Sequence, residues 1–271
     1  MLFFYKIEKN LNQANFVYIK NLIDRNKFSS ELLAVSPAEG PSKGINVMWL
    51  FVAYKQFHLL GELIEKGVAT SKILTASPAE EPSKGINVTW LLACFQQFNL
   101  LKKLIDQKLI TKEILIAASP EQGDEKGKNV AWLLAFHKQF DLLETLIDQK
   151  LITSEILAAS PEQGVNKGKN VVWLLVAYKN FDLLLKIKNI ITLDTIMAPS
   201  PTPLDILLGQ KDKQVDLLIF KILLQQMGNE IIRLPGVNSK ILESISFYEY
   251  KNIAEQLPTD DFDRKPLYLL L

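Results

Sequence analysis

The apolar positions of this chain recur with a period of about 41 residues. Each copy begins with a box of the form Gly-x-Asn-Val-x-Trp-Leu, and the four tryptophans of these boxes are Trp49, Trp90, Trp132 and Trp173. A phenylalanine about eight residues after each tryptophan opens a second apolar run, such as Phe-Asp-Leu-Leu-Glu-Thr-Leu-Ile-Asp, with helical spacing. Self-similarity of this kind predicts an array of stacked units with two helices in each unit.

Short polar residues in front of the apolar runs predict where the helices begin. The predicted N-caps of the first helices, whose side-chain oxygens accept from unpaired backbone N–H groups, are Asn46, Asn87, Asn129 and Asn170. Between units, Thr153 is placed to cap a short helix, and Ser160-Pro161-Glu162-Gln163 has the capping-box pattern of a further helical turn. Gly164 and Gly168 indicate turns.

The ends of the array depart from the repeat. Residues 1–43 hold a degenerate early copy and are predicted to form an N-terminal capping repeat, residues 44–213 hold the repeats, and residues 214–271 are predicted to form a C-terminal helical cap. A stack of repeats needs such caps, because its terminal units must turn a polar face to water. The predicted fold is therefore all-α, a helical repeat solenoid with helical N- and C-terminal caps.

One segment connects the repeats to a known family. Thr202-Pro203-Leu204-Asp205 follows the last box at a period near 33 residues and resembles the Thr-Pro-Leu-His helix opening of ankyrin repeats. Asn129-Val130-Ala131-Trp132 stands in the same slots of an earlier copy, so Trp replaces His, and each unit carries an insert of about eight residues. The chain is thus similar to the ankyrin-repeat family from about Asn15 to Gln225. A three-helix armadillo-type unit has a comparable period and remains an alternative.

Composition limits the classes of partner. Lys and Arg number 31 against 30 Asp and Glu, for a net charge of +1, so we expect neither nucleic acid nor a membrane surface as a partner. The single cysteine, Cys94, cannot form an internal disulfide, and no apolar window reaches the roughly 18 residues of a membrane span. We expect a soluble, cytoplasmic monomer from a reducing compartment. Its Lys-, Ile- and Asn-rich composition is similar to that of ankyrin proteins that intracellular bacteria deliver into host cells.

Two adjacent columns form the candidate binding surface. The slot five positions after each tryptophan holds Tyr54, Phe95, His137 and Tyr178, and the next slot holds Lys55, Gln96, Lys138 and Lys179. Aromatic side chains are favoured interface anchors, and lysines suit acidic groups on a partner. Half-buried packing between helices, with the lysines on a solvated face, explains the same pattern equally well.

No catalytic, cofactor or metal site is predicted. His58 and His137 occupy different slots without another ligand at metal-binding spacing, and Cys94 lies in an apolar run without a basic neighbour. The Trp column is interpreted as a buried ladder between neighbouring units.

The family resemblance implies an adaptor or a blocker of a partner. The predicted function is a non-catalytic protein–protein interaction scaffold that binds through the inner-helix row and the inserts. The alternatives are a regulatory inhibitor subunit of one specific enzyme, or an enzyme with a site in the groove or the C-terminal region.

Overall fold

The computed structural model describes residues 20–27, 29–39, 43–79, 84–116, 125–192 and 195–196. The chain divides into two compact units, Met1–Val171 and Val172–Leu271. Every regular element in the described ranges is helical. The predicted C-terminal cap at 214–271 and the segment Thr202-Pro203-Leu204-Asp205 lie outside these ranges.

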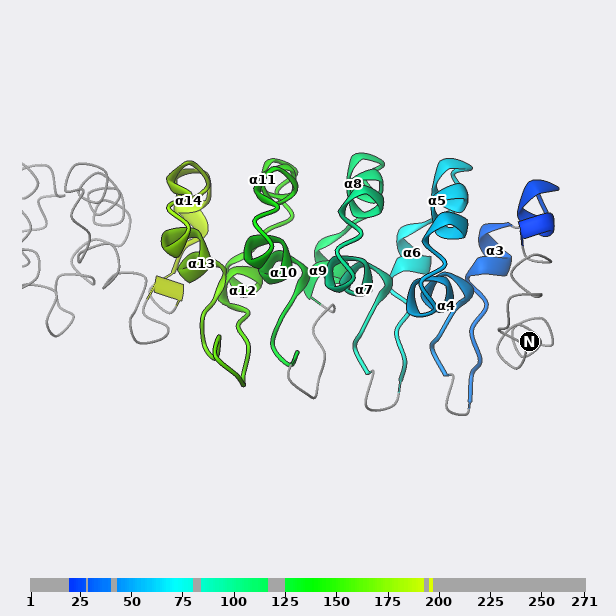
Figure 1. The fold of residues 1–271 in the computed structure, drawn as a ribbon, viewed down its shortest axis with the longest axis horizontal. Helices are drawn as coiled ribbons and strands as arrows, with labels where there is room; N and C mark the ends of the chain where they lie inside the picture. The colour runs from blue at the N-terminus through cyan, green and yellow to red at the C-terminus, as the bar shows by residue number, and fades with distance from the viewer. Residues whose placement is uncertain are drawn as a thin grey trace, which may run out of the picture. The chain divides into compact units, whose positions relative to one another are not determined.

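The first unit contains helix triplets that follow one another along the stack. The inner helices, of seven residues each, are α4 (Val47–Ala53), α7 (Val88–Cys94) and α10 (Val130–Phe136). The outer helices, of nine residues each, are α5 (Phe57–Glu65), α8 (Phe98–Asp106) and α11 (Phe140–Asp148). The short third helices are α6 (Ser71–Leu74), α9 (Lys112–Ile116) and α12 (Ser154–Ala158). Figure 1 shows the inner and outer helices in two rows, so the prediction of a helical repeat with sequentially packed helix pairs is confirmed.

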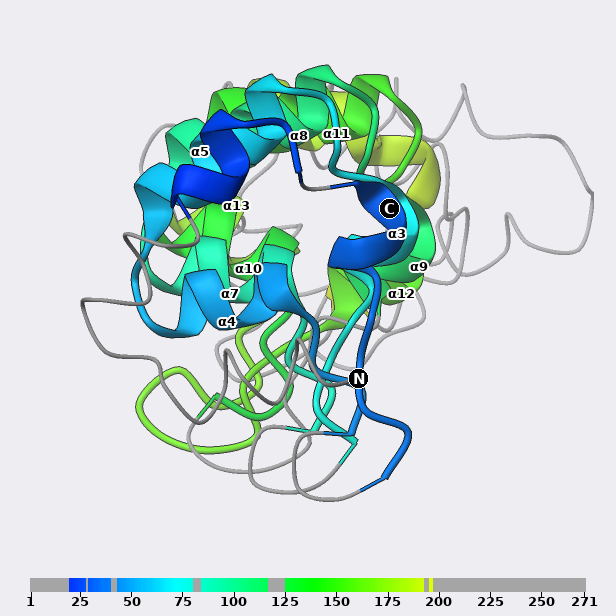
Figure 2. The ribbon, with the colours of Figure 1, turned by 90° about the vertical axis from the view of Figure 1, so that its right-hand side faces the viewer.

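Within this stack the three kinds of helix occupy three positions around its long direction. The view along the stack in Figure 2 shows α5, α8 and α11 together, α4, α7 and α10 together, and α9 and α12 in a third position. A further short helix, α3 (Ser30–Leu33), precedes the first inner helix. The described helices of the second unit are α13 (Val171–Ala177), which begins at the boundary, α14 (Phe181–Ile187) and the 3-10 helix η1 (Lys188–Ile190).

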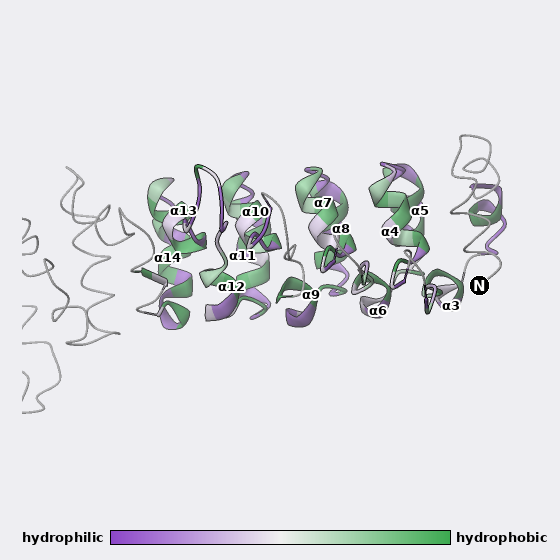
Figure 3. Cartoon of the chain, turned by 90° about the horizontal axis from the view of Figure 1, so that it is seen from below, coloured by the Kyte–Doolittle hydropathy of each residue, from purple (hydrophilic) through white to green (hydrophobic). Residues whose placement is uncertain are grey.

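The inner helices carry no charged residue and, apart from Thr89 in α7, are almost entirely apolar, which is the pattern of a buried helix. In α10, Leu134 and Ala135 are fully buried, and Trp132 is 1% exposed. The outer helices are amphipathic, with buried residues such as Leu143 and Leu146 on one face. Hydrophilic residues, purple in Figure 3, gather at the turns, in the loops and on the short third helices.

A buried asparagine closes each repeat. The Asn129 Oδ1 atom accepts from the N–H of Trp132 at 2.8 Å, which confirms the predicted cap. The Asn129 Nδ2 atom donates to the carbonyl of Ile156 in the third helix at 2.9 Å. Asn46 and Asn87 make the same two bonds in their repeats. A single side-chain amide therefore provides a hydrogen-bond partner for a backbone N–H at the start of the inner helix and for a backbone carbonyl of the third helix, neither of which has a partner within its own helix.

The tryptophans join each repeat to the next. The indole Nε1 atom of Trp90 donates to the carbonyl of Lys128 at 2.7 Å, and that of Trp132 donates to the carbonyl of Lys169 at 2.6 Å. Trp49 makes the same bond to Ile86 at 2.8 Å. In these three cases the accepting residue directly precedes the next asparagine, so Trp49, Trp90 and Trp132 form a ladder between repeats. Trp90 and Trp132 are buried as predicted, whereas Trp49 is half-buried.

Both turns of each repeat end in a residue with left-handed backbone. At the first turn, the Lys138 φ is 56°, its N–H donates to Ala135, and the N–H of Gln139 donates to Leu134. This pair of bonds is a Schellman motif, in which glycine is the favoured residue. We call the three such residues of the first unit the first-turn row: Lys55, Gln96 and Lys138. The equivalent residues after the outer helices form the second-turn row: Gly67, Lys108 and Lys150.

The inserts are loops that hydrogen-bond to one another. The N–H of Glu162 donates to the carbonyl of Lys126 at 3.1 Å, and the N–H of Ala79 donates to that of Lys43 at 3.0 Å. The ammonium of Lys126 also lies 2.9 Å from the Glu162 carboxylate.

The capping-box prediction at Ser160 is wrong, because residues 160–169 form bends and turns without a helix. The Ser160 carbonyl instead packs against Gly127 of the preceding insert, where a Cβ atom would lie 2.1 Å from that oxygen. Gly44 meets the Ser77 carbonyl in the same way, at 2.3 Å. The close approach of two loop backbones thus fixes the conformation that the serine adopts.

The described residues before the first inner helix repeat the second half of a unit. Helical residues 20–24 end before Asn26, whose φ is 52°, and the Ser29 side chain caps α3 by accepting from Leu32 N–H. Ile23 and Leu33 are fully buried. The early copy seen in the sequence therefore has the helical arrangement of its successors over these residues.

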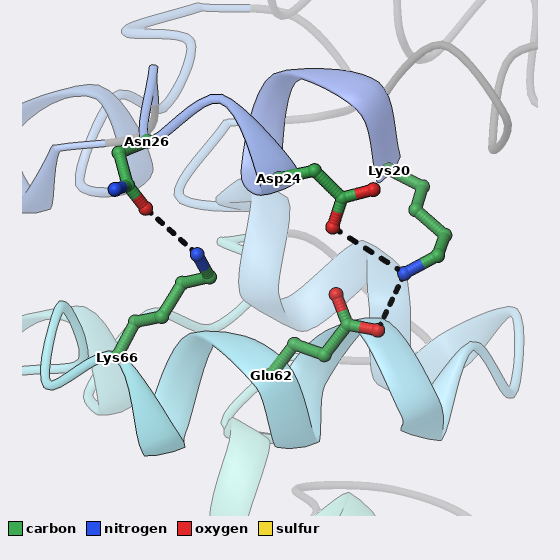
Figure 4. A network of polar contacts seen from close by, with 5 residues as sticks. All are labelled: Lys20, Asp24, Asn26, Glu62 and Lys66. Atoms are coloured by element: carbon green, nitrogen blue, oxygen red, sulfur yellow. Dashed lines mark hydrogen bonds and ion pairs between the residues drawn. The ribbon is translucent and has the colours of Figure 1, made fainter.

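Polar contacts join this early copy to α5. The Lys20 ammonium lies 2.7 Å from the Glu62 carboxylate and 3.5 Å from that of Asp24, while Lys66 donates to the Asn26 side chain at 2.7 Å (Figure 4). The Lys20 side chain is 45% exposed and that of Glu62 is 30% exposed. Ion pairs this accessible to water contribute little to stability.

We expect Asn129→Ala to destabilise the protein more than loss of an ordinary helix cap. Removal of the cap costs about 1 kcal/mol. The Ile156 carbonyl also loses its partner, which costs about 1–3 kcal/mol more. The matched control is Thr153→Ala, which removes the α12 cap bond to Ile156 N–H and leaves no buried amide partner unpaired. Equal losses for both variants in urea unfolding would contradict this role for Asn129.

We expect Gly127→Ala to be far more damaging than Gly164→Ala. Both glycines have positive φ, 84° and 75°, so alanine at either position strains the backbone by about 1–2 kcal/mol. Only at Gly127 does the added Cβ meet a backbone carbonyl, since nothing lies within 4 Å at Gly164. Thermal unfolding should therefore show a small fall in Tm for Gly164→Ala and a large one for Gly127→Ala. Similar shifts would show that the loops separate at little cost.

Candidate partner-binding surface

The predicted binding residues lie where each inner helix ends. Tyr54, Phe95 and His137 are the C-cap residues of α4, α7 and α10, and we call them the aromatic row. The first-turn row follows them directly in the sequence. In the second unit, Tyr178 and Lys179 hold the equivalent places after α13, and the Lys179 φ is 57°. The structure thus brings three members of each predicted column into register across three stacked repeats.

The aromatic row differs in exposure along the stack. Tyr54 is 50% exposed, whereas Phe95 and His137 are half-buried. Each half-buried ring packs against the first residue of the outer helix in the preceding repeat. The Phe95 and Phe57 ring centroids are 6.1 Å apart, and those of His137 and Phe98 are 5.8 Å apart. Packing between repeats therefore accounts for part of this column, and both rings stay partly exposed.

A lysine of the first-turn row lies over the aromatic row. The Lys55 Nζ atom is 5.4 Å from the centre of the Phe95 ring, which belongs to the next repeat. A cation at this distance from an aromatic face is attracted by the ring quadrupole. The side chain thus extends along the stack, and cationic and aromatic groups share one strip.

The Glu125 carboxylate acts electrostatically on His137, in the half-buried part of the strip. This carboxylate is 2.9 Å from the Lys128 ammonium, which itself lies 5.3 Å from the Trp132 ring centre. Burial lowers the pKa of His137, and the negative charge of Glu125 acts in the opposite direction. The imidazole is therefore mainly neutral at neutral pH, and it resembles the phenyl and phenol rings of its sister positions.

The described residues near the strip offer little for covalent chemistry. Burial raises the pKa of the Cys94 thiol, and Glu125 adds to this effect while Lys128 opposes it. A protonated thiol is a weak nucleophile. Across the described ranges, no three His, Cys, Asp or Glu side chains gather closely enough to hold a metal ion. No described helix has the length and apolar character needed to cross a membrane.

The structure also identifies surface residues that the sequence analysis did not single out. Val165 at an insert tip is 90% exposed, and Ile116 at the end of α9 is 40% exposed. Lys108 and Lys150 of the second-turn row are exposed as well. The recurrence of Asp-Gln-Lys after the outer helices was a visible signal for the second-turn row, but nothing in the sequence indicated its left-handed backbone.

These features define a helical repeat protein. Comparison of the chain with protein-family models, with curated proteins and with solved structures gave no significant match. The assignment to a class therefore depends on the repeat and on the contacts between its units.

We expect His137→Tyr, which copies the sister residue Tyr178, to remove a pH dependence of stability. The pKa of His137 is below its ordinary value of 6.5 in the folded protein, so the unfolded chain binds a proton first on acidification. The free energy of unfolding of the wild type should fall as pH falls through 6.5, and it should be highest above that pH. Denaturation above and below this pH should show a smaller change for the variant. His58→Tyr is the control, and an equal effect there would contradict the assignment.

Proposed function

We propose that this protein is a non-catalytic scaffold that binds another protein through the strip formed by the aromatic row and the first-turn row. The observation that carries the proposal is Tyr54, a large aromatic side chain that is half exposed beside a lysine at a helix end. Exposed aromatic residues on a rigid framework are typical anchors at protein interfaces. The same slot in the next two repeats continues the strip with rings that their neighbours hold in place.

The proposal extends to the kind of repeat. We assign the units to a divergent ankyrin-like class, with the short third helix as an addition. Support comes from the pair of short helices joined by a tight turn, and from the loops between units that hydrogen-bond to the preceding loop. An armadillo-type unit has three helices, and the third helix of four or five residues favours that alternative.

The proposed setting is the cytoplasm, where the single thiol of Cys94 stays reduced. The likeness in composition to ankyrin proteins of intracellular bacteria extends this to delivery into a host cell, where the target would be a host protein. By itself the chain is proposed to be a monomer of 30.7 kDa.

The scaffold proposal predicts that Tyr54→Ala weakens binding of the natural partner at least about tenfold while Tm stays unchanged, because the side chain is an exposed anchor. The partner is first recovered by affinity capture with the wild type and mass spectrometry, and its affinity for each variant is then measured by calorimetry. Val165→Ala is the matched control, since it removes an exposed apolar side chain from an insert.

Three outcomes separate the possibilities. Loss of affinity only in Tyr54→Ala supports the strip. Loss only in Val165→Ala moves the interface to the inserts. Failure to recover any protein partner, together with turnover of a small substrate, would show that the chain is an enzyme and would overturn the scaffold proposal.

A further inference from the structure

The three tryptophans of the first unit make the same hydrogen bond but are not covered to the same extent. Trp90 and Trp132 are 3% and 1% exposed, whereas Trp49 is half-buried. The indole Nε1 atom of Trp49 already donates to the Ile86 carbonyl at 2.8 Å. The accessible surface of this side chain therefore belongs mainly to its apolar ring atoms.

The residue four positions after each tryptophan lies one turn further along the same helix, within reach of the indole. In α10 this residue is Phe136, whose ring stacks on Trp132 with the ring centroids 4.9 Å apart and the planes 12° apart. In α4 the same position holds Ala53, whose single methyl group cannot cover an indole. The third repeat thus shows which kind of group fits on the tryptophan, and the first repeat does not supply that group at this position.

The second repeat has a different arrangement. Cys94 holds this position in α7, where burial raises the pKa of its thiol and the charges of Glu125 and Lys128 also act on it. These two side chains form an ion pair at 2.9 Å, so charged groups of the next repeat lie near this position. In the first repeat the residue that corresponds to Lys128 is the uncharged Ile86. The first tryptophan therefore has no corresponding ion pair beside it.

From this comparison we infer that the partner protein places an aromatic side chain, phenylalanine or tyrosine, on the indole of Trp49, as Phe136 lies on Trp132. The inference rests on the proposed scaffold function and adds the chemistry of the partner residue to it. Tyr54 directly follows Ala53 and is 50% exposed, so this contact is continuous with the strip. Aromatic side chains that become buried in this way typically contribute most of the affinity of an interface.

The charge beside Trp49 adds a second feature of the partner. Lys55 follows Tyr54 and is exposed, and its ammonium lies 5.4 Å from the centre of the Phe95 ring. Among the described residues Lys55 forms no salt bridge. A carboxylate near the aromatic residue of the partner would complement this charge. The occupant that we propose is therefore a short protein segment in which an aromatic residue lies beside an acidic one.

A protein side chain fits this site better than a nucleotide base does. Bases also stack on aromatic faces, but single-stranded nucleic acid needs in addition a groove of positive charge along its backbone. In the third repeat Lys128 lies 5.3 Å from the centre of the Trp132 ring, whereas the first repeat has the buried Ile45 at the corresponding position. The surroundings of Trp49 are thus more apolar than those of its sister residue, which favours a hydrocarbon ring as the occupant.

The test begins with selection from a displayed library of random peptides, with the full chain as bait. The affinity of the selected peptides is then measured for the wild type, for Ala53→Phe and for the control Val165→Phe. Ala53→Phe lets the chain cover Trp49 with a ring of its own, whereas Val165→Phe adds the same ring at an exposed insert tip. Labelled oligo-dT is titrated in parallel.

A second measurement locates the bound peptide on the wild-type protein. The four tryptophans are replaced biosynthetically by fluorotryptophan, and fluorine NMR then follows one resonance for each of them. The resonance of Trp49 is assigned by its absence from the spectrum of Trp49→Phe. This measurement does not depend on the folding of Ala53→Phe.

We expect the selected peptides to carry Phe or Tyr close to Asp or Glu. Their affinity should fall at least about tenfold in Ala53→Phe and stay nearly unchanged in Val165→Phe. The Tm of Ala53→Phe should not fall, because Phe136 shows that this position accommodates a ring. Peptide binding should shift the Trp49 resonance and leave those of the two buried tryptophans of the first unit in place.

Selected peptides without aromatic enrichment, an empty selection or tighter binding of oligo-dT would each overturn the inference. An affinity that is unchanged in Ala53→Phe, an equal loss in both variants or a Trp49 resonance that does not move would also overturn it. In each of these cases, loss of natural-partner binding in Tyr54→Ala would still support the scaffold. The two proposals can therefore fail separately.

Discussion

The rest of the stack depends on one buried side-chain amide in each repeat. Asn46, Asn87 and Asn129 are at most 3% exposed, and an amide buried without partners is costly. Each one is satisfied only when the inner helix starts at its place and the third helix folds back to offer a carbonyl. Apolar packing alone would tolerate sliding between helices, whereas these bonds define a single register.

The tryptophans extend this constraint from one repeat to the next. The Trp90 indole donates to the carbonyl of Lys128, and that residue directly precedes Asn129. Trp90 lies in α7, the helix that Asn87 caps. The position of Asn129 is therefore linked to the helix of the preceding repeat. The close contact of Gly127 with the Ser160 carbonyl joins the inserts of two neighbouring repeats in the same way. A repeat protein gains its stability from such nearest-neighbour contacts, since no unit can bury its apolar face alone.

Much of this could be predicted because the relevant interactions are local in sequence. The Asn129 cap and the helix start at Phe140 follow from short-range spacing, and both were predicted correctly. The Ser160 turn was not, because the Gly127 contact comes from another loop. The half-burial of Phe95 likewise depends on Phe57 in the preceding repeat. Positive φ at a lysine such as Lys138 leaves no signature in the sequence, since glycine is the residue that normally reports it.

The left-handed turns bear on where function can lie. The asparagine, tryptophan and glycine positions of each repeat are fixed by their contacts. The residues that can differ between repeats without breaking these contacts therefore lie mainly in the turns, the third helices and the inserts. Within the described turns, Gly67 shows that glycine is compatible with such a position. Six equivalent positions nevertheless hold lysine or glutamine with positive φ: Lys55, Gln96, Lys108, Lys138, Lys150 and Lys179. A non-glycine residue there strains the backbone by about 1 kcal/mol. Strain at these solvent-facing positions is compatible with the proposed role of the side chains in binding.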